Sequence, residues 1–250
     1  MSANPLHQFE IHSIMPLELG GFNVALTNQS VWMIGAVLFV TMLMLLGSRK
    51  PALVPGRMQS LVEVTVDFIR TLTRDTAGEE GLRFLPFIAT LFLFIATMNI
   101  AGMIPGSFTA TSQMVVTGMM AVAVFLMVIA IGIYVQGWHF FALFYPHGTP
   151  WWLAPLIVTL EVISFCARPI TLALRLAANM MAGHILLKIF ATFIIMLMAG
   201  LPLGLNVLGA AVPLAVNIAL TGLEIGVALL QAYIFTILTC VYLHDALHGH

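Results

Sequence analysis

Long apolar segments follow one another along most of this chain, separated by short polar stretches. Five such segments can be traced: residues 31–47, 84–104, 114–136, 154–198 and 209–244. The first three suit spanning α-helices, which need about 20 mostly apolar residues. The last two, at about 1.5 Å per residue, far exceed a hydrocarbon core of about 30 Å. For these two we expect strong tilt, or a kink at Pro169.

A basic, amphipathic stretch separates the first two apolar segments. Six of the nine Lys and Arg residues lie in it: Arg49, Lys50, Arg57, Arg70, Arg74 and Arg83. By the positive-inside rule it is cytoplasmic or matrix-side, which makes the N-terminal segment, residues 1–30, external. Its helical-period pattern predicts an amphipathic helix along the membrane surface. The polar face is formed by Glu63, Asp67, Arg70 and Arg74, and the apolar face by Leu61, Val62, Val66, Ile69 and Leu72. Two interpretations of the polar face stay open: a solvated surface or a docking surface for another subunit.

Three connecting stretches complete the pattern. Residues 109–113 are expected to form a polar turn on the outer side. Residues 138–152 are rich in Trp and Tyr and include His139 and His147, which favours an interfacial or re-entrant segment. Residues 199–210, which contain Pro202 and Gly204, are the break between the two longest segments.

Composition supports this membrane interpretation. The 250-residue chain is 61% hydrophobic and 8% charged, whereas a soluble domain needs roughly a quarter of its residues charged. The predicted fold class is an all-α polytopic membrane protein with about five spanning helices plus an amphipathic interfacial helix. Its predicted domains are the external segment 1–30 and one transmembrane helical domain, 31–250, which contains the amphipathic stretch 51–83 and a long antiparallel hairpin, 154–244. Cys166 and Cys240 fall inside apolar segments and are interpreted as small core residues.

Ionisable residues inside the fourth segment are the most informative feature. Charges at membrane depth are costly and by default mark a pathway or a relay. The stretch EVISFCARPITLALRLAANMMAGH carries Glu161, Arg168, Arg175, Asn179 and His184. Mostly apolar, uncharged residues flank Arg175 for several turns, and a guanidinium group keeps its charge. The sequence therefore places a fixed positive charge inside a membrane segment.

Polar residues of the last two segments fall into one register. Glu161, Arg168 and Arg175 are spaced by seven, as are Asn217, Glu224 and Gln231, so each set forms one helical stripe. Thr171 and Asn179 flank Arg175 at four residues on either side. Antiparallel folding about Leu203 would place Arg175 opposite Gln231 and His184 opposite Glu224. This coincidence predicts a single polar site between the two segments.

Arg175 and His184 are nine residues apart and so lie on opposite sides of an ideal helix. We therefore expect two cavities, one with His184 and Glu224 toward the outer side and one with Glu161 toward the inner side. Arg175 would lie between them as a plug.

Structural alternatives stay open for several of these residues. Arg168 precedes Pro169 and could satisfy backbone carbonyls freed at a kink. Asn99 and Asn217 could be interhelical hydrogen-bonding residues, and His184 with Glu224 a neutral buried pair. The histidines of the C-terminal end, His244, His248 and His250, are interpreted as solvated, with no recognised metal-ligand spacing.

At LRLAANMMAGH the sequence resembles subunit a of the F-type ATP synthase, in the form found in mitochondria and related bacteria. The stretches QAYIFTILTCVYL and MNIAGMIPG resemble two further motifs of this family, and the resemblance runs from about residue 30. It implies that Arg175 is the essential arginine, Gln231 its partner and Glu161 the inner half-channel carboxylate. It also implies that His184 and Glu224 form the outer polar pair and that Asn179 and Asn217 line the channel.

The same resemblance implies a proton-translocating stator subunit without catalytic activity or cofactor, in a bacterial inner membrane or, alternatively, the mitochondrial inner membrane. Its partners would be the c-subunit ring, b-type peripheral stalk subunits and the rest of the ATP synthase. The alternative function is a proton-coupled secondary transporter, which would normally show an internal repeat that this sequence lacks. Choice between H⁺ and Na⁺ would lie chiefly in the ring.

Overall fold

The computed structural model describes residues 12–15, 18–19, 22–23, 25–49, 52–104, 107–137, 140, 153–200 and 205–248. Two short antiparallel pairs of strands lie in the N-terminal segment, where the sequence indicated only a polar stretch. Strand β1 (Ser13–Met15) pairs with β4 (Leu26–Thr27), and β2 (Glu18–Leu19) pairs with β3 (Phe22–Asn23). The aromatic stretch 138–152, apart from Phe140, and residues 201–204 lie outside the described residues.

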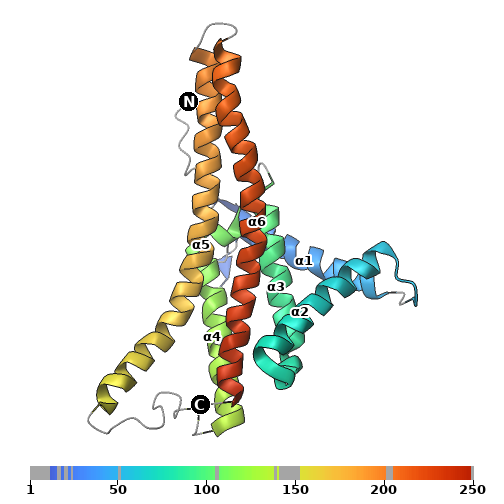
Figure 1. Ribbon diagram of the computed structural model, residues 1–250, viewed down its shortest axis with the longest axis vertical. Helices are drawn as coiled ribbons and strands as arrows, with labels where there is room; N and C mark the ends of the chain where they lie inside the picture. Colours follow the sequence, from blue (N-terminus) through green and yellow to red (C-terminus); the bar gives the residue numbers. More distant parts are fainter. Residues whose placement is uncertain are drawn as a thin grey trace.

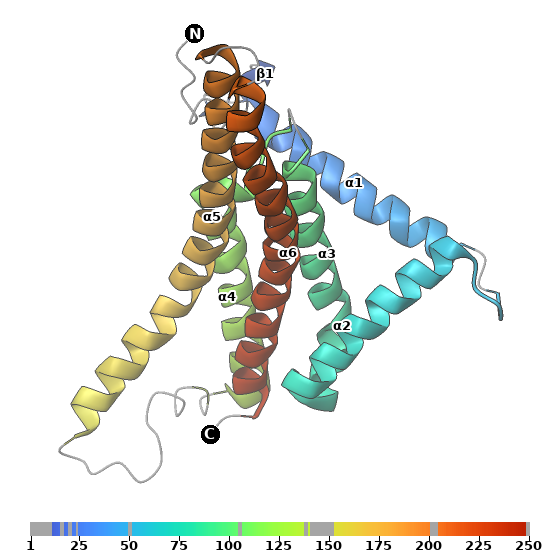
Figure 2. The same cartoon turned by 45° about the horizontal axis from the view of Figure 1, so that its top comes forward.

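Helices α1 (Asn28–Ser48) and α2 (Arg57–Gly81) form a V whose apex points away from the rest of the molecule, as Figure 2 shows. The side chain of Thr27 caps α1 by accepting a hydrogen bond from the Ser30 amide at 3.3 Å, which satisfies one of the free amides at a helix start. At the apex of the V the helices touch at Gly47, where a Cβ would lie 2.5 Å from Val62 Cγ2. Only glycine permits this approach.

Helix α2 has the amphipathic pattern that the sequence predicted. Val62, Ile69 and Leu72 are buried, whereas the four charged residues of the polar face are exposed. Leu61 does not follow the prediction, since it is 52% exposed. The helix is broken at Gly78, whose φ of 76° is a left-handed value that favours glycine.

A short 3₁₀ turn, η2 (Leu82–Phe84), leads into α3 (Leu85–Gly102), and a second one, η3 (Ala110–Ser112), leads into α4 (Met114–Gln136). The bounds of α4 match the predicted segment, and those of α3 differ by two residues or fewer. The turn at 109–113 differs from expectation, because Thr109, Thr111 and Ser112 are buried rather than exposed. It packs against α3, α4 and the next helix of the chain.

The two longest helices, α5 (Ala154–Gly200) and α6 (Leu205–His248), run side by side over their upper parts in Figures 1 and 2. Their 47 and 44 residues correspond to roughly 70 Å each, far more than a hydrocarbon core. The N-terminal part of α5 turns away from α6, and this helix contains Pro169, as the prediction of a kink or tilt required. Helix α6 contains Pro213, which our sequence interpretation did not single out.

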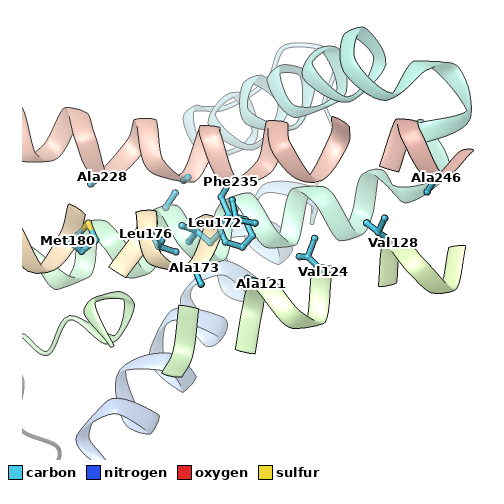
Figure 3. Packing of buried hydrophobic residues seen from close by; sticks show 13 residues of the cluster. Ala121, Val124, Val128, Leu172, Ala173, Leu176, Met180, Ala228, Phe235 and Ala246 are labelled. Carbon is cyan, nitrogen blue, oxygen red and sulfur yellow. The ribbon is translucent and has the colours of Figure 1, made fainter. Parts of the chain in front are cut away.

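Helix α6 is the centre of the bundle, because it packs against α2, α3, α4 and α5. The largest apolar cluster joins α3, α4, α5 and α6 around Phe235, Leu172 and Leu176 (Figure 3). Ala228 and Ala232 of α6 are fully buried in it, and such small residues let membrane helices approach closely. The packing thus fixes the register of α5 against α6.

Five helical stretches in the described part of the chain are long and apolar enough to cross a membrane, which confirms the predicted all-α polytopic fold. Two smaller expectations are wrong. His244 belongs to helix α6 rather than to a tail, although its side chain is exposed as expected. Cys240 is buried as predicted, but Cys166 is exposed on α5.

Candidate functional site

A cavity of about 490 Å³ lies between α5 and α6 at the level of the predicted polar site. Arg175 and Asn179 line it from α5, and Glu224 and Gln231 from α6. The remaining lining is mostly leucine and other apolar side chains. Four of the polar residues that the register brought together therefore share one space, although they are up to 56 positions apart in the sequence.

Arg175 lies at the exposed side of this cavity. Among the described residues, no carboxylate lies within ion-pair distance of its guanidinium group. The predicted neighbour Gln231 is buried and receives a hydrogen bond from Asn179 Nδ2 to its Oε1 at 3.0 Å. Within the described chain, the Gln231 Nε2 atom has no hydrogen-bond partner. Arg175 and Gln231 thus share the cavity, but Asn179, one turn further along α5, makes the direct contact.

His184 and Glu224 face each other across the helix pair, as the register predicted. His184 Nδ1 lies 3.6 Å from Glu224 Oε1, just beyond hydrogen-bonding distance, and both side chains are buried. The other ring nitrogen, Nε2, lies 3.0 Å from Thr109 Oγ1. His184 therefore occupies the space between Glu224 and the buried turn before α4.

The Glu224 carboxyl group lies against backbone where α5 has no side chain. A Cβ on Gly183 would be only 2.6 Å from Glu224 Oε1, so this glycine makes room for the carboxyl group. Within the described residues neither Glu224 oxygen has a hydrogen-bond partner. A buried carboxyl group without fixed partners keeps the freedom to bind or release a proton.

Arg168 lies in different surroundings from those expected. Instead of turning to backbone carbonyls near Pro169, its Nη1 donates a hydrogen bond to Asp245 Oδ2 at 3.0 Å. Its guanidinium carbon also lies 5.0 Å from the ring centre of Tyr242 and 5.6 Å from that of Phe165. The ion pair and the cation–π contact with Tyr242 tie α5 to the C-terminal end of α6, whereas Phe165 lies on α5 itself.

The other predicted residues are more scattered. Asn99 is buried and its Nδ2 donates to the Ala228 carbonyl at 2.9 Å, which joins α3 to α6 as its structural interpretation expects. Asn217 Oδ1 is buried with no hydrogen-bond partner in the described part of the chain. Thr171 donates to the Arg168 carbonyl at 2.9 Å, within its own helix. Glu161 is half-buried on the diverging part of α5 and does not line the cavity.

Chemically, this arrangement suits proton movement. Among the described residues, no group of three or more His, Cys, Asp or Glu side chains is placed to hold a metal ion. The site combines a fixed positive charge, a buried carboxyl group and a neighbouring imidazole. Carboxyl and imidazole groups can exchange protons directly or through water, whereas the guanidinium group cannot.

Our sequence interpretation missed three site residues. Asp245 continues the stripe of Asn217, Glu224 and Gln231 two steps of seven further on, so the spacing could have indicated it. Gly183 could not be assigned from spacing, because its importance depends on what lies opposite. Thr109 was assigned only to a polar turn on the outer side, and its contact with His184 becomes visible only in the packing of that turn.

Comparisons with known proteins show which proteins this chain resembles. A family model described as ATP synthase A chain matches residues 30–244. The chain is 49% identical over 99% of its length to the ATP synthase subunit a of Parvibaculum lavamentivorans, covering 95% of that protein. It is 48% identical to the proteins of the same name from Sinorhizobium fredii and Rhodopseudomonas palustris, with at least 98% of each relative covered.

Proposed function

This chain belongs to the ATP synthase A chain family, and from that premise we propose that it provides two offset half-channels separated by Arg175. Family membership makes it a non-catalytic subunit of the proton-conducting membrane sector of F-type ATP synthase. With its apolar helices and bacterial relatives, it is a multi-pass bacterial inner membrane protein. Because the chain belongs to this family, the alternative function of a secondary transporter is set aside.

The observation that carries the proposal is the position of Arg175. It lies on the exposed side of α5, at a cavity that also contains Glu224 and Gln231, and it has no carboxylate partner among the described residues. An uncompensated charge at membrane depth is costly, so it calls for a partner that supplies negative charge. A carboxylate on a ring of c subunits passing the exposed face of α5 would be such a partner.

Arg175 would act on the ring in two ways. A ring carboxyl group can enter the apolar membrane only when it is neutral, so it carries its proton there. Opposite Arg175 its charged form is favoured, and the proton leaves. The same charge repels any proton that would pass directly from one half-channel to the other. Each charge that crosses contributes about 2.3 kcal/mol per 100 mV, which is the energy that the ring could convert into rotation.

On the outer side, Glu224 and His184 would deliver protons to the ring. Glu224 borders both the Arg175 cavity and His184, so it connects the buried imidazole with the ring-facing space. Asn217 and Asn99 would line this path, and Asn179 with Gln231 would set its boundary beside Arg175. Among the described residues the side-chain oxygens of Glu224 and Asn217 have no hydrogen-bond partner, which supports this path, since buried polar atoms normally have partners.

On the inner side, Glu161 would be the carboxylate of the second half-channel. It lies on the part of α5 that turns away from α6, fourteen residues from Arg175. Arg168 and Thr171 would have secondary, structural roles there.

The exposed charged face of α2, on the V formed by α1 and α2, would suit b-type stalk subunits. The N-terminal segment, residues 1–30, would be external. Residues 51–83 would be cytoplasmic and would belong to the single transmembrane domain, residues 31–250.

Side-specific thiol labelling tests the two half-channels. In a background with Cys166→Ser and Cys240→Ala, Asn217→Cys should react with a charged thiol reagent only from outside, and Glu161→Cys only from inside. Val162→Cys, which is exposed beside Glu161, is the control for membrane-facing positions that water does not reach. Labelling of both positions from the same side, or of either from both sides, would contradict the proposal.

A further inference from the structure

The buried turn between α3 and α4 holds the imidazole of His184 in place. Thr109, at the start of this turn, is 5% exposed, and its hydroxyl oxygen lies 3.0 Å from His184 Nε2. The same hydroxyl donates to the Gly102 carbonyl at 3.2 Å. Because a hydroxyl group carries one proton, a Thr109 that donates to Gly102 can only accept at its other contact. The hydrogen in that contact must then come from His184.

The position of Thr109 is itself fixed by packing and hydrogen bonds. A Cβ on Gly102 would lie 2.7 Å from Thr109 Cγ2, so glycine is needed for this approach. Ser112 Oγ donates to the Thr109 carbonyl at 2.6 Å, and Ser107 Oγ donates to the Gly102 carbonyl at 2.9 Å. These bonds hold the hydroxyl group of Thr109 beside the ring of His184 before any proton moves.

We propose that Thr109 is a positioning residue: its hydroxyl accepts the Nε2–H of His184 and leaves Nδ1 as the nitrogen that exchanges a proton with Glu224. In neutral imidazole one nitrogen carries the hydrogen and the other accepts. The hydrogen bond at one nitrogen therefore determines the role of the other. With Nε2 protonated toward Thr109, the lone pair of Nδ1 points toward the carboxyl group 3.6 Å away.

The resulting step balances. A proton leaves the Glu224 carboxyl group and bonds to Nδ1, which gives a carboxylate and an imidazolium with hydrogen on both nitrogens. The reverse transfer restores the neutral pair, and the Nε2–H bond stays intact throughout. Because both Glu224 oxygens lack hydrogen-bond partners among the described residues, a small side-chain movement suffices to close the 3.6 Å gap. His184 thus stores and returns a proton through the nitrogen facing Glu224.

This inference rests on the proposed function, and a set of four variants separates the two. Passive proton flux is measured in vesicles that carry the assembled membrane sector without its catalytic head, normalised to assembled subunit. Thr109→Val keeps the shape but lacks the hydroxyl, and should lower flux by about two- to tenfold, the value of one hydrogen bond. Thr109→Ser should restore it. In a His184→Ala background, Thr109→Val should cause no further loss, because Thr109 acts through His184.

The inference would be overturned if Thr109→Val lowered proton flux equally in the wild-type and His184→Ala backgrounds. It would also be overturned if Thr109→Val kept full flux although His184→Ala alone lowered it. If His184→Ala itself conducts normally, the proposed role of His184 in the pathway fails instead.

A spectroscopic test is independent of flux. In ¹⁵N-histidine-labelled complex, the His184 signal is assigned among the eight histidines by its loss in His184→Ala. Neutral His184 should show a protonated Nε2 and a bare Nδ1; hydrogen on Nδ1 in the wild type would refute the assignment of Thr109.

Discussion

Arg168 and Arg175 lie on the same stripe of α5, two helical turns apart, but in different surroundings. Arg168 is half-buried, pairs with Asp245 at 3.0 Å and lies over the ring of Tyr242. Arg175 is exposed at the edge of a cavity, and no carboxylate of the described chain compensates its charge. The described chain neutralises Arg168 from within but supplies no carboxylate to Arg175, for which we have proposed a partner on the ring.

The difference shows that an arginine in a membrane helix takes its role from what faces it. Residue type, spacing and helix are the same for both, and in the sequence only the neighbouring Pro169 favoured a structural role for Arg168. Their distinction comes from α6, which presents Asp245 to Arg168 and the uncharged Gln231 to the level of Arg175. A paired arginine holds helices together, whereas an unpaired one can act on a charge that arrives and leaves.

We expect the largest loss of activity when lysine replaces the unpaired arginine, and a much smaller loss when it replaces the paired one. Arg175→Lys should reduce proton-driven ATP synthesis roughly a hundredfold or more, because a compact ammonium group lacks the planar fork and can lose its proton when buried. Arg168→Lys should retain most activity, because an ammonium group can still pair with Asp245. ATP synthesis in energised vesicles, normalised to assembled complex, measures both. Similar losses in the two variants would mean that the arginines do not differ in role.

Glu224→Gln should give the next largest effect. An amide cannot exchange protons with water or imidazole, so proton flux should fall by roughly ten- to a hundredfold. His184→Ala should cost less, since water can bridge from Glu224 to the outside. Proton pumping driven by ATP hydrolysis measures the two variants side by side. Undiminished pumping by Glu224→Gln would remove this carboxyl group from the pathway.

Gly183→Ala should disturb the same carboxyl group through packing. The new methyl group would lie 2.6 Å from Glu224 Oε1, closer than van der Waals contact allows, so the glutamate side chain must move away. We expect a loss of flux of roughly three- to tenfold, as displacement of a reacting group is costly. Gly118→Ala is the matched control, because a Cβ there meets nothing within 4 Å. Normal flux in Gly183→Ala would show that the close approach to Glu224 is not needed.

Asp245→Asn should have the smallest effect on flux, less than about twofold, but should weaken assembly. It leaves the partly buried charge of Arg168 uncompensated, at a cost of about 1–3 kcal/mol. The midpoint of thermal disassembly should therefore fall, and Asp245→Glu should retain the wild-type value. Adding Arg168→Met should recover part of the loss, because no charge then stays unpaired. A large loss of flux at normal stability would place Asp245 in the proton path instead.

Much of the fold could be predicted because lipid forces backbone groups into helices, so hydrophobic length reveals the spans. The α4 bounds and the facing of His184 and Glu224 followed from segment length and seven-residue spacing. The turn containing Thr109 could not be placed from its polarity. The hydroxyl groups of Thr109 and Ser112 form hydrogen bonds with residues close and distant in sequence, so these polar side chains can be buried. The Thr111 hydroxyl oxygen is also buried, but it has no hydrogen-bond partner among the described residues.

The partner of Arg168 was missed for a geometric reason. A single antiparallel register puts Leu238 opposite Arg168, but Asp245 lies seven residues beyond it. The alignment of the two helices changes along their length, since α5 turns away from α6 toward this end. The seven-residue spacing places Asp245 on the correct stripe of α6, but a straight antiparallel register does not include such a bend and so does not pair Asp245 with Arg168. The offset between predicted and observed facing residues therefore increases with distance from the break at residues 199–210.

The most direct test of the account is the proton permeability of vesicles containing the complete complex without nucleotide. A stalled catalytic head prevents rotation, so wild-type vesicles should hold a proton gradient. Arg175→Ala should let the gradient collapse roughly ten times faster or more, because no fixed charge then separates the half-channels. Arg168→Ala, compared at equal amounts of assembled complex, should stay as tight as the wild type. Arg175→Ala vesicles as tight as the wild type would contradict the claim that this arginine separates two half-channels.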